Sequence, residues 1–495
     1  MNLTQRLKRS LMPTAGEKAA LTGTSGTASA VNKYVTDTDY RLNPPAVRRI
    51  VVADMQPHES WSADGTATNQ ADTVHFKTGT QGLELEVLTG SNDFHSLVLD
   101  KPVKVYGAVG IWFYAPDPTK ILSIQLRIYP ANGEAPYYSE YITLAGNHYY
   151  GLKAGDWWFV NINPRKFTLG AGAPVWGASG TWIEKIRIRC QAQTGNTTLT
   201  VGGIIAEDGL DVGTGTPVGA ICLGFDGAYD TQYSVAFTDM QARGWPGTEW
   251  VALGGVDVTS PGSVIGATQM TLTQLIEMYN AGWDVAHQGS YTANIFSVAT
   301  TEADFRASMS KNRFLFSSLG FHRGLNIASW GGHHGICDDT NVPVILKELG
   351  YVSSRGVVAW SDVYPNIAWG YGPEGWTTNN VWNPGDYYQV GSDGPNNKTV
   401  ADAESMITDV VNRRTFAHLY SHQIMPDVDW VAGNVKQSVW DAMIAKMDEY
   451  VASGQLIVIS YTQYLAMTLF RNSSVQYGTD GSLQMKSLPT NLEVF

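Results

Sequence analysis

The 495-residue chain has few cysteines and few charged residues, and each scarcity excludes a class of protein. Its three cysteines, Cys190, Cys222 and Cys337, have a spacing that fits neither a zinc knuckle nor a disulfide framework, so we expect free, mostly buried thiols. Charged residues make up 16% of the chain, the net charge is −12, and no basic stripe is present. We therefore expect no nucleic-acid partner.

Long apolar runs are also missing. The first residues, MNLTQRLKRSLM, contain no apolar core of a secretory signal peptide, and no segment approaches the length of a membrane span. We expect synthesis in a cytoplasm, no membrane insertion, and exit by another route, such as release of virus particles by lysis. Heptads and a triple β-helix pattern are lacking too, so the sequence leaves open a monomer or a homo-oligomer such as a trimer.

Glycine (51), tyrosine (24) and tryptophan (16) are abundant. Such a composition suits β-rich, loop-rich domains whose aromatic side chains stack on sugars, although burial in a core is the commoner role for any one tryptophan. The length predicts roughly two to four domains. We divide the chain into an arm, a β-sandwich, an α/β domain and a tail, with the bounds 1–48, 49–208, 209–470 and 471–495.

The arm contains a small-residue linker at 21–30, followed by NKYVTDTDYRL at 32–42. The second segment resembles a short element that recurs near the start of bacteriophage tail and fibre proteins. This resemblance implies a virion protein that is attached through its N-terminus to other tail proteins and acts outside the host cell. The alternative is an ordinary flexible arm.

The second part predicts an all-β domain. Short runs with alternating apolar residues, separated by turn residues, occur at 83–89, 109–115, 124–130, 157–162, 183–190 and 199–205. This pattern is typical of a β-sandwich. The order of the segments resembles the jelly rolls that serve as carbohydrate-binding modules. A glycan-binding module and a purely structural spacer both fit, because a fold does not determine a function.

From Pro217 onward, apolar strands alternate with amphipathic helices. Strands are predicted at 220–225, 248–253, 283–287, 325–330, 351–355, 416–421 and 456–461. Helices are predicted at 233–244, 271–282, 303–319, 342–350, 401–412 and 435–453. This alternation predicts a parallel sheet or a barrel, with the functional site at the carboxyl ends of the strands.

Four blocks in this third part resemble, in the right order, those of the polysaccharide deacetylases (carbohydrate esterase family 4). They are LGFDGAYD and its continuation at 223–251, AGWDVAHQGSYTAN at 281–294, LNIASWGGHHG at 325–335 and AHLYSHQI at 417–424. The resemblance implies a distorted (β/α) barrel that removes N- or O-acetyl groups from a glycan. It also implies a divalent metal, usually zinc, which polarises the acetyl carbonyl and activates a water molecule.

The resemblance assigns two catalytic residues. Asp226 falls on the general base and His422 on the acid that protonates the leaving group. Tyr420 and Trp330 are the candidate sugar contacts, although Trp330 also fits a core position. His418, deeper on the same strand as His422, is interpreted as structural.

The metal ligands carry over incompletely. Gly227 stands where the family has its metal-binding Asp, and Asp230, three residues later, fits either a ligand or a helix N-cap. In the second block, one register places Gln288 and Thr292 on the two His positions, and a one-residue shift places His287 and Tyr291 there. The further candidate ligands are His287 and the adjacent pair His333 and His334.

Two functions follow from this mixture. The first is an active deacetylase with a rebuilt metal site, which acts on capsule or other acetylated polysaccharide of the host surface. The second is a degenerate deacetylase that binds glycan or serves as a virion scaffold. Intact Asp226 and His422 favour the first, and the loss of three ligand positions favours the second, because metal affinity depends steeply on the ligands.

Overall fold

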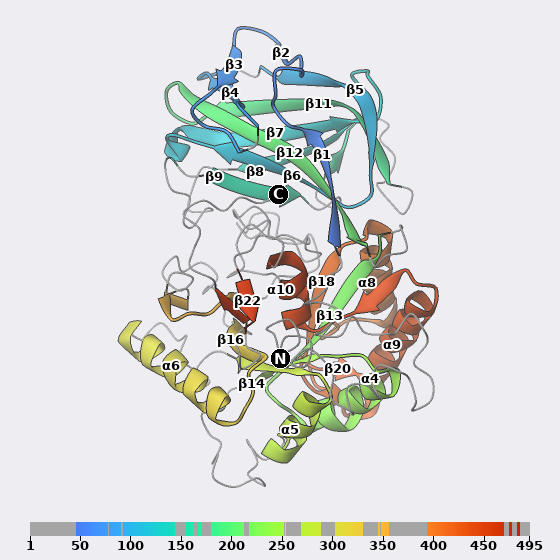
Figure 1. Cartoon of the computed structure of the whole chain (residues 1–495). Coiled ribbons are helices and arrows are strands. Elements are labelled where there is room, and N and C mark those ends of the chain that lie inside the picture. Colours follow the sequence, from blue (N-terminus) through green and yellow to red (C-terminus); the bar gives the residue numbers. More distant parts are fainter. Residues whose placement is uncertain are drawn as a thin grey trace, which may run out of the picture.

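The protein is seen in a computed structural model as two lobes, one above the other in Figure 1. The structure describes residues 46–143 (except 78, 91 and 92), 155–162 (except 156), 167–170, 180–211, 217–253 (except 252), 269–288, 302–329, 345–355 (except 347), 394–469, 475–477 and 483–485. Trp330, His333 and His334 lie outside the described residues. In the described part of the chain, no helix has the length and apolar character needed to cross a bilayer.

The first lobe consists of two antiparallel sheets of six strands each. One sheet has the order β3 (Asn69–Asp72), β4 (Gly82–Val87), β12 (Thr197–Asp211), β6 (Ala108–Tyr114) and β9 (Trp157–Ile162), with β1 (Ala46–Ala53) beside β12. The other has the order β10 (Thr168–Leu169), β8 (Tyr138–Thr143), β7 (Ile121–Tyr129), β11 (Thr181–Ala192), β5 (His95–Val105) and β2 (Ser62–Ala63). The alternating apolar residues of both sheets form one buried core, as a β-sandwich requires.

The second lobe is built on a curled, seven-stranded parallel sheet that forms an open half-barrel in the described residues. Its order is β17 (Ser353–Arg355), β16 (Gly324–Ser329), β15 (Asp284–Gln288), β14 (Thr248–Val251), β13 (Gly219–Asp226) and β18 (Phe416–Ser421), with β21 (Leu456–Val458) also paired to β13. Every residue of β13 is buried, as expected for a parallel strand that is covered on both faces.

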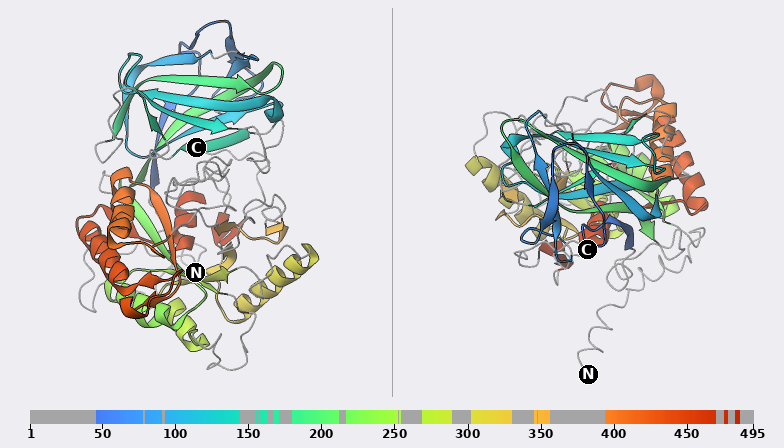
Figure 2. Two further views of the ribbon diagram at one scale, coloured as in Figure 1. Left: turned by 180° about the vertical axis from the view of Figure 1, so that it is seen from behind. Right: turned by 90° about the horizontal axis from the view of Figure 1, so that it is seen from above.

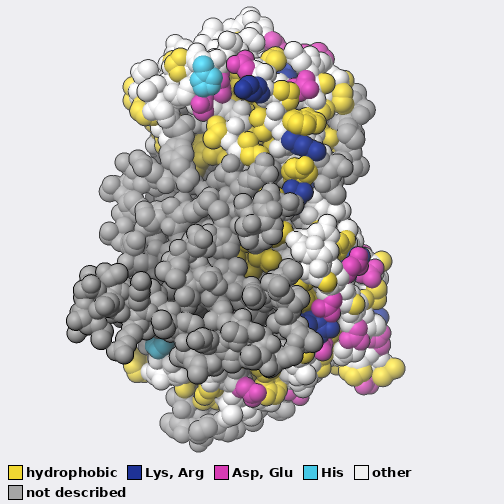
Figure 3. Space-filling model, turned by 45° about the vertical axis from the view of Figure 1, so that its right-hand side comes forward, with side chains coloured by type: hydrophobic (Ala, Val, Ile, Leu, Met, Phe, Trp, Pro, Cys, Tyr) yellow, Lys and Arg dark blue, Asp and Glu magenta, His cyan; other side chains and the backbone are white. Residues whose placement is uncertain are grey.

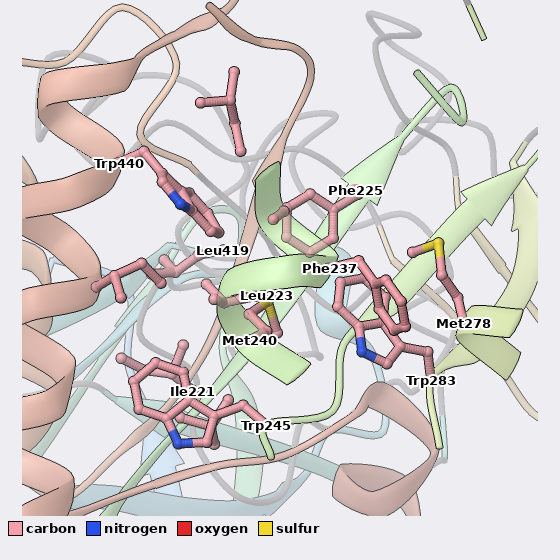
Figure 4. Packing of buried hydrophobic residues seen from close by; sticks show 14 of the residues in the cluster. Ile221, Leu223, Phe225, Phe237, Met240, Trp245, Met278, Trp283, Leu419 and Trp440 are labelled. Carbon is pink, nitrogen blue, oxygen red and sulfur yellow. The ribbon is translucent and has the colours of Figure 1, made fainter. Parts of the chain in front are cut away.

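Helices cover the outer face of this sheet, and α8 and α9 pack together on one flank in both views of Figure 2. These helices are α4 (Thr238–Arg243), α5 (Leu272–Asn280), α6 (Glu302–Ser318), α8 (Val400–Arg413) and α9 (Gln437–Ala452). Helix α10 (Tyr461–Leu469) packs on the opposite face, with Trp250 and Ala286. Capping boxes at Thr271 and Thr399 start α5 and α8 by satisfying backbone N–H groups. Figure 4 shows the resulting core, in which Phe225 of β13 packs against Trp283 and Trp440.

Several elements differ from the sequence prediction. The predicted helix at 233–244 begins as a π-helical segment, η4 (Gln232–Phe237), before α4. The predicted strand 456–461 ends at Val458, and the unpredicted helix α10 follows it. The parallel sheet is confirmed, whereas closure into a full barrel stays a prediction because the described strands remain open. Cys190 and Cys222 are buried free thiols, as predicted.

Candidate functional site

Asp226 and His422 lie at neighbouring strand ends, on β13 and just after β18, at the carboxyl edge of the parallel sheet. Phe225 of β13 pairs with Ser421 of β18, so the next residues on the two strands are Asp226 and His422. Parallel strands end at the same edge of a sheet, and ligand sites in such folds lie at that edge. The two residues to which the deacetylase resemblance assigns catalysis are thus brought together from positions almost 200 residues apart.

A buried glutamine joins the two strand ends. The side-chain amide of Gln232 donates to the carbonyl oxygens of Asp226 (2.9 Å) and His422 (3.3 Å). Its own oxygen accepts from the Tyr229 N–H at 2.6 Å. Gln232 is fully buried, so these bonds face no competition from water. It therefore positions the backbone beneath both candidate catalytic residues.

The side chain of Asp226 is held by an arginine that the sequence had not singled out. Arg355, the last residue of β17, donates through Nη2 to Asp226 Oδ1, and both side chains are 0% exposed. The guanidinium lies 5.0 Å from the ring centre of Trp250 and 5.1 Å from that of Tyr420. Asp226 Oδ2 has no hydrogen-bond partner among the described residues. This oxygen is the atom of the carboxylate left for a water molecule or ligand.

The surroundings keep two other buried groups neutral. Burial, reinforced by the charge of Asp226, raises the pKa of Glu249 well above its ordinary value, and the carboxyl accepts from the Ala228 N–H at 3.1 Å. Burial, together with the charge of Arg355, lowers the pKa of His418 well below its ordinary value. A protonated Glu249 and a neutral His418 leave Asp226 and Arg355 as the charged pair at this edge.

His422 has a defined tautomer. Its Nδ1 lies 2.7 Å from the carbonyl oxygen of Gly433, and a carbonyl can only accept, so Nδ1 carries a proton. The Nε2 atom is then the one that can exchange a proton with a ligand. The backbone N–H of His422 donates to Asn396 Oδ1 at 3.2 Å, and its ring meets Tyr420 edge-on at 5.7 Å. The predicted sugar contact Tyr420 therefore lies beside both Arg355 and His422.

His287, a predicted metal ligand, is not brought together with Asp226. The register pairs Asp226 with Trp250, and Trp250 with Ala286, so these side chains share one face and the next residue, His287, points to the other. There its ring stacks on Phe316 of α6 at 4.1 Å, and Nδ1 lies 2.9 Å from the Tyr351 hydroxyl. Burial, with a smaller contribution from the Arg313 charge, lowers the pKa of His287 to about 3. His287 is a neutral residue of the helix-covered face.

The other predicted ligands do not supply a metal site in the described residues. Asp230 is exposed near the start of η4, and Thr231, the residue before η4, caps it with no side-chain bond. Gly227 has φ +93, and a Cβ there would lie 2.9 Å from the Tyr229 ring, so this backbone disfavours the carboxylate that the family carries at that position.

The zinc implied by the resemblance does not fit the described donors around Asp226. The described side-chain partner of Asp226 is the Arg355 guanidinium, whose positive charge beside the carboxylate opposes the binding of a divalent cation there. Among the described residues, a group of three metal-compatible side chains occurs at Asp54, His58 and Glu59 in the sandwich and not in the parallel-sheet lobe. There the Glu59 carboxylate already accepts from two backbone N–H groups and Trp61.

Comparison with known proteins gives fold-level similarities of low score. No family model and no curated protein matches the sequence. The chain is similar to a family 11 carbohydrate-binding module from Clostridium thermocellum in complex with a mixed-linked tetrasaccharide, with 15% identity over 34% of this chain and 99% of that chain and a TM-score of 0.24. It is also similar to a T48 deacetylase with substrate, with 12% identity over 51% and 92% of the two chains and a TM-score of 0.29. TM-scores this low carry no argument about function, which must rest on the site.

Proposed function

We propose that the parallel-sheet lobe is a carbohydrate-active hydrolase that removes acetyl groups from a polysaccharide of the host surface. The observation that carries this proposal is the adjacent placement of Asp226 and His422 at the carboxyl edge of β13 and β18. The ordered resemblance of four sequence blocks to polysaccharide deacetylases supplies the reaction class.

The chemistry follows from the two side chains. Oδ2 of Asp226 takes a proton from the water molecule that attacks the acetyl carbonyl carbon. Protonated His422 donates from Nε2 to the departing nitrogen or oxygen, while the Gly433 carbonyl stabilises the imidazolium through Nδ1. The products are acetate and the free amine or hydroxyl of the sugar. Arg355 acts through Asp226 by holding its other oxygen.

The proposal contains no metal step, because the described donors do not fit one. The metal content of protein purified without chelator decides whether the chain nevertheless binds zinc through residues such as His333 and His334, and mass spectrometry measures it. A zinc ion whose loss abolishes acetate release would show that the metal-assisted route of the family operates.

Asp226→Asn tests the base. We expect acetate release from an acetylated polysaccharide to fall by about a hundredfold or more, the usual contribution of a general base. The matched control is Asp230→Asn, which removes a neighbouring exposed carboxylate and should leave release unchanged. Full activity in Asp226→Asn would refute the assignment. Because Asp226 is paired with Arg355, the folded state of this variant must be checked by circular dichroism before its activity is compared.

The alternative function is glycan binding without turnover. The observation that favours it is the left-handed Gly227, which stands where the family has a metal ligand. Under this alternative the wild-type protein binds acetylated polysaccharide and releases no acetate.

We also propose, from the resemblance at residues 32–42, that the protein belongs to a bacteriophage tail and is held there through its first 48 residues. Deletion of residues 1–45, which stops just before β1, should then abolish its recovery with purified particles while leaving the isolated protein folded. Recovery of the truncated chain with particles would argue against an attachment arm. Light scattering would distinguish a monomer from a homo-oligomer such as a trimer.

A further inference from the structure

Three arginines lie together on the outward face of the β5–β7–β11 sheet of the sandwich. Arg127 of β7 pairs in register with Arg187 of β11, and Arg189 pairs with Gln125. The residues between them, such as Leu126 and Ile188, belong to the sandwich core, so the arginines point to the opposite face. We call Arg127, Arg187 and Arg189 the arginine row.

The arginine row is gathered around one aromatic ring. The three guanidiniums lie 4.3, 4.5 and 5.2 Å from the ring centre of Phe94, and Arg127 also lies 4.7 Å from that of Tyr137. Cation–π packing holds guanidiniums flat and in place, and it leaves their N–H groups able to bind an anion. The row is therefore preorganised, in contrast to three flexible surface side chains.

Two polar atoms on this face lack hydrogen-bond partners among the described residues. Gln125 is 2% exposed, and its Oε1 accepts no hydrogen bond from the described residues. The Nε atom of Arg127 is buried without an acceptor among the same residues. Gln125 and Arg127 lie two residues apart on the same face of β7. Buried polar groups are almost always hydrogen-bonded, so an unpaired amide oxygen and an unpaired guanidinium N–H on this face favour a ligand with both donors and acceptors.

The charges of the row are only partly neutralised. Arg187 donates to Glu134 at 2.5 Å and to Asp64, and Lys185 donates to the same Glu134 at 2.6 Å. Arg127, in contrast, forms no ion pair with a carboxylate that the structure describes, although its charge helps to lower the pKa of Glu134. In a chain with a net charge of −12, a cationic surplus at one place favours an anionic ligand there.

We propose that the arginine row binds an acidic saccharide through the carboxylates of its sugar residues. A guanidinium matches a carboxylate in a two-bond geometry, and the Gln125 amide suits a sugar hydroxyl. A long polyphosphate is disfavoured, because the rest of the −12 chain would repel it. This site lies in the sandwich lobe and does not depend on hydrolysis at Asp226.

The test measures binding of a galacturonic acid oligomer to the full chain by titration calorimetry. Arg127→Gln should weaken binding by about tenfold or more, since a hydrogen bond to a charged group typically contributes that much affinity. Arg127→Lys keeps the positive charge but lacks the paired N–H donors of a guanidinium, so this variant should bind with intermediate affinity. Lys101→Gln, which removes an exposed charge from β5 of the same sheet, is the matched control and should bind like the wild type. Melting curves establish that each variant is folded.

Four results would overturn the proposal. The first three are absence of binding to the acidic oligomer, equal binding of a neutral glucose oligomer, and equal loss in Arg127→Gln and Lys101→Gln. Binding of a thymidylate oligomer as tightly as the acidic saccharide would also overturn it, because the row would then recognise any polyanion. Asp226→Asn should bind the oligomer normally, so a failure of the proposed hydrolase would not be mistaken for a failure of this site.

Discussion

Replacing Arg355 with methionine should destabilise the parallel-sheet lobe far more than a surface ion pair would. Asp226 and Arg355 are both 0% exposed, so the variant leaves a carboxylate in the interior without its cation. Removing one partner of a buried pair typically costs about 3–5 kcal/mol, which is a large share of the roughly 5–15 kcal/mol that stabilises a domain. Methionine fills much of the arginine volume, so the loss reports mainly on charge and hydrogen bonding.

Urea unfolding followed by tryptophan fluorescence would measure this change, because Trp250 packs against the guanidinium. The matched control is Arg243→Met, whose partner Asp448 is 44% exposed while Arg243 is 30% exposed. Solvent screens such a pair, and its loss should cost less than about 1 kcal/mol. The two lobes need not unfold in one transition. The wild type and the variants are therefore compared by the urea transition of the parallel-sheet lobe.

A double variant completes the test. Asp226→Asn combined with Arg355→Met removes both charges, so its cost should be clearly less than the sum of the two single changes. Strict additivity, or an Arg355→Met cost no larger than that of Arg243→Met, would refute the buried ion pair as a determinant of this site.

Two further predictions concern the histidines. Below pH 6.5 the unfolded chain protonates His287, whereas the folded chain, in which the pKa of His287 is about 3, does not. The free energy of unfolding should therefore decrease as the pH is lowered from 6.5 towards 3, by up to about 1.4 kcal/mol per pH unit. His287→Phe should reduce that slope in urea unfolding, and an unchanged slope would show that His287 does not stay neutral. If His422 protonates the leaving group, His422→Ala should lower kcat for acetate release by about a hundredfold or more and leave glycan affinity unchanged; a loss of affinity with unaltered kcat would instead indicate a recognition role.

Much of the fold was predictable because local signals and tertiary structure agree. The alternating runs at 183–190 and 199–205 lie within β11 and β12, and the segment from Thr271 to Gly282 is a capped helix with a left-handed glycine at its end. Helix α10 was missed because its first residues continue an apolar strand pattern, which periodicity alone does not distinguish from a helix. The π-helical start of η4 has no sequence signature that we recognise.

The sequence by itself determined most of the order of strands and helices, because strand ends follow from where apolar runs stop. The resemblance to the deacetylases supplied the two candidate catalytic residues. Only the tertiary structure decided what surrounds them. Arg355 reaches Asp226 from β17, at the far edge of the sheet order, and His287 points away from Asp226 because of a single-residue register between β13, β14 and β15. Shifting a strand by one residue moves each of its side chains to the opposite face of the sheet. The register is set by packing between strands that are distant in the chain.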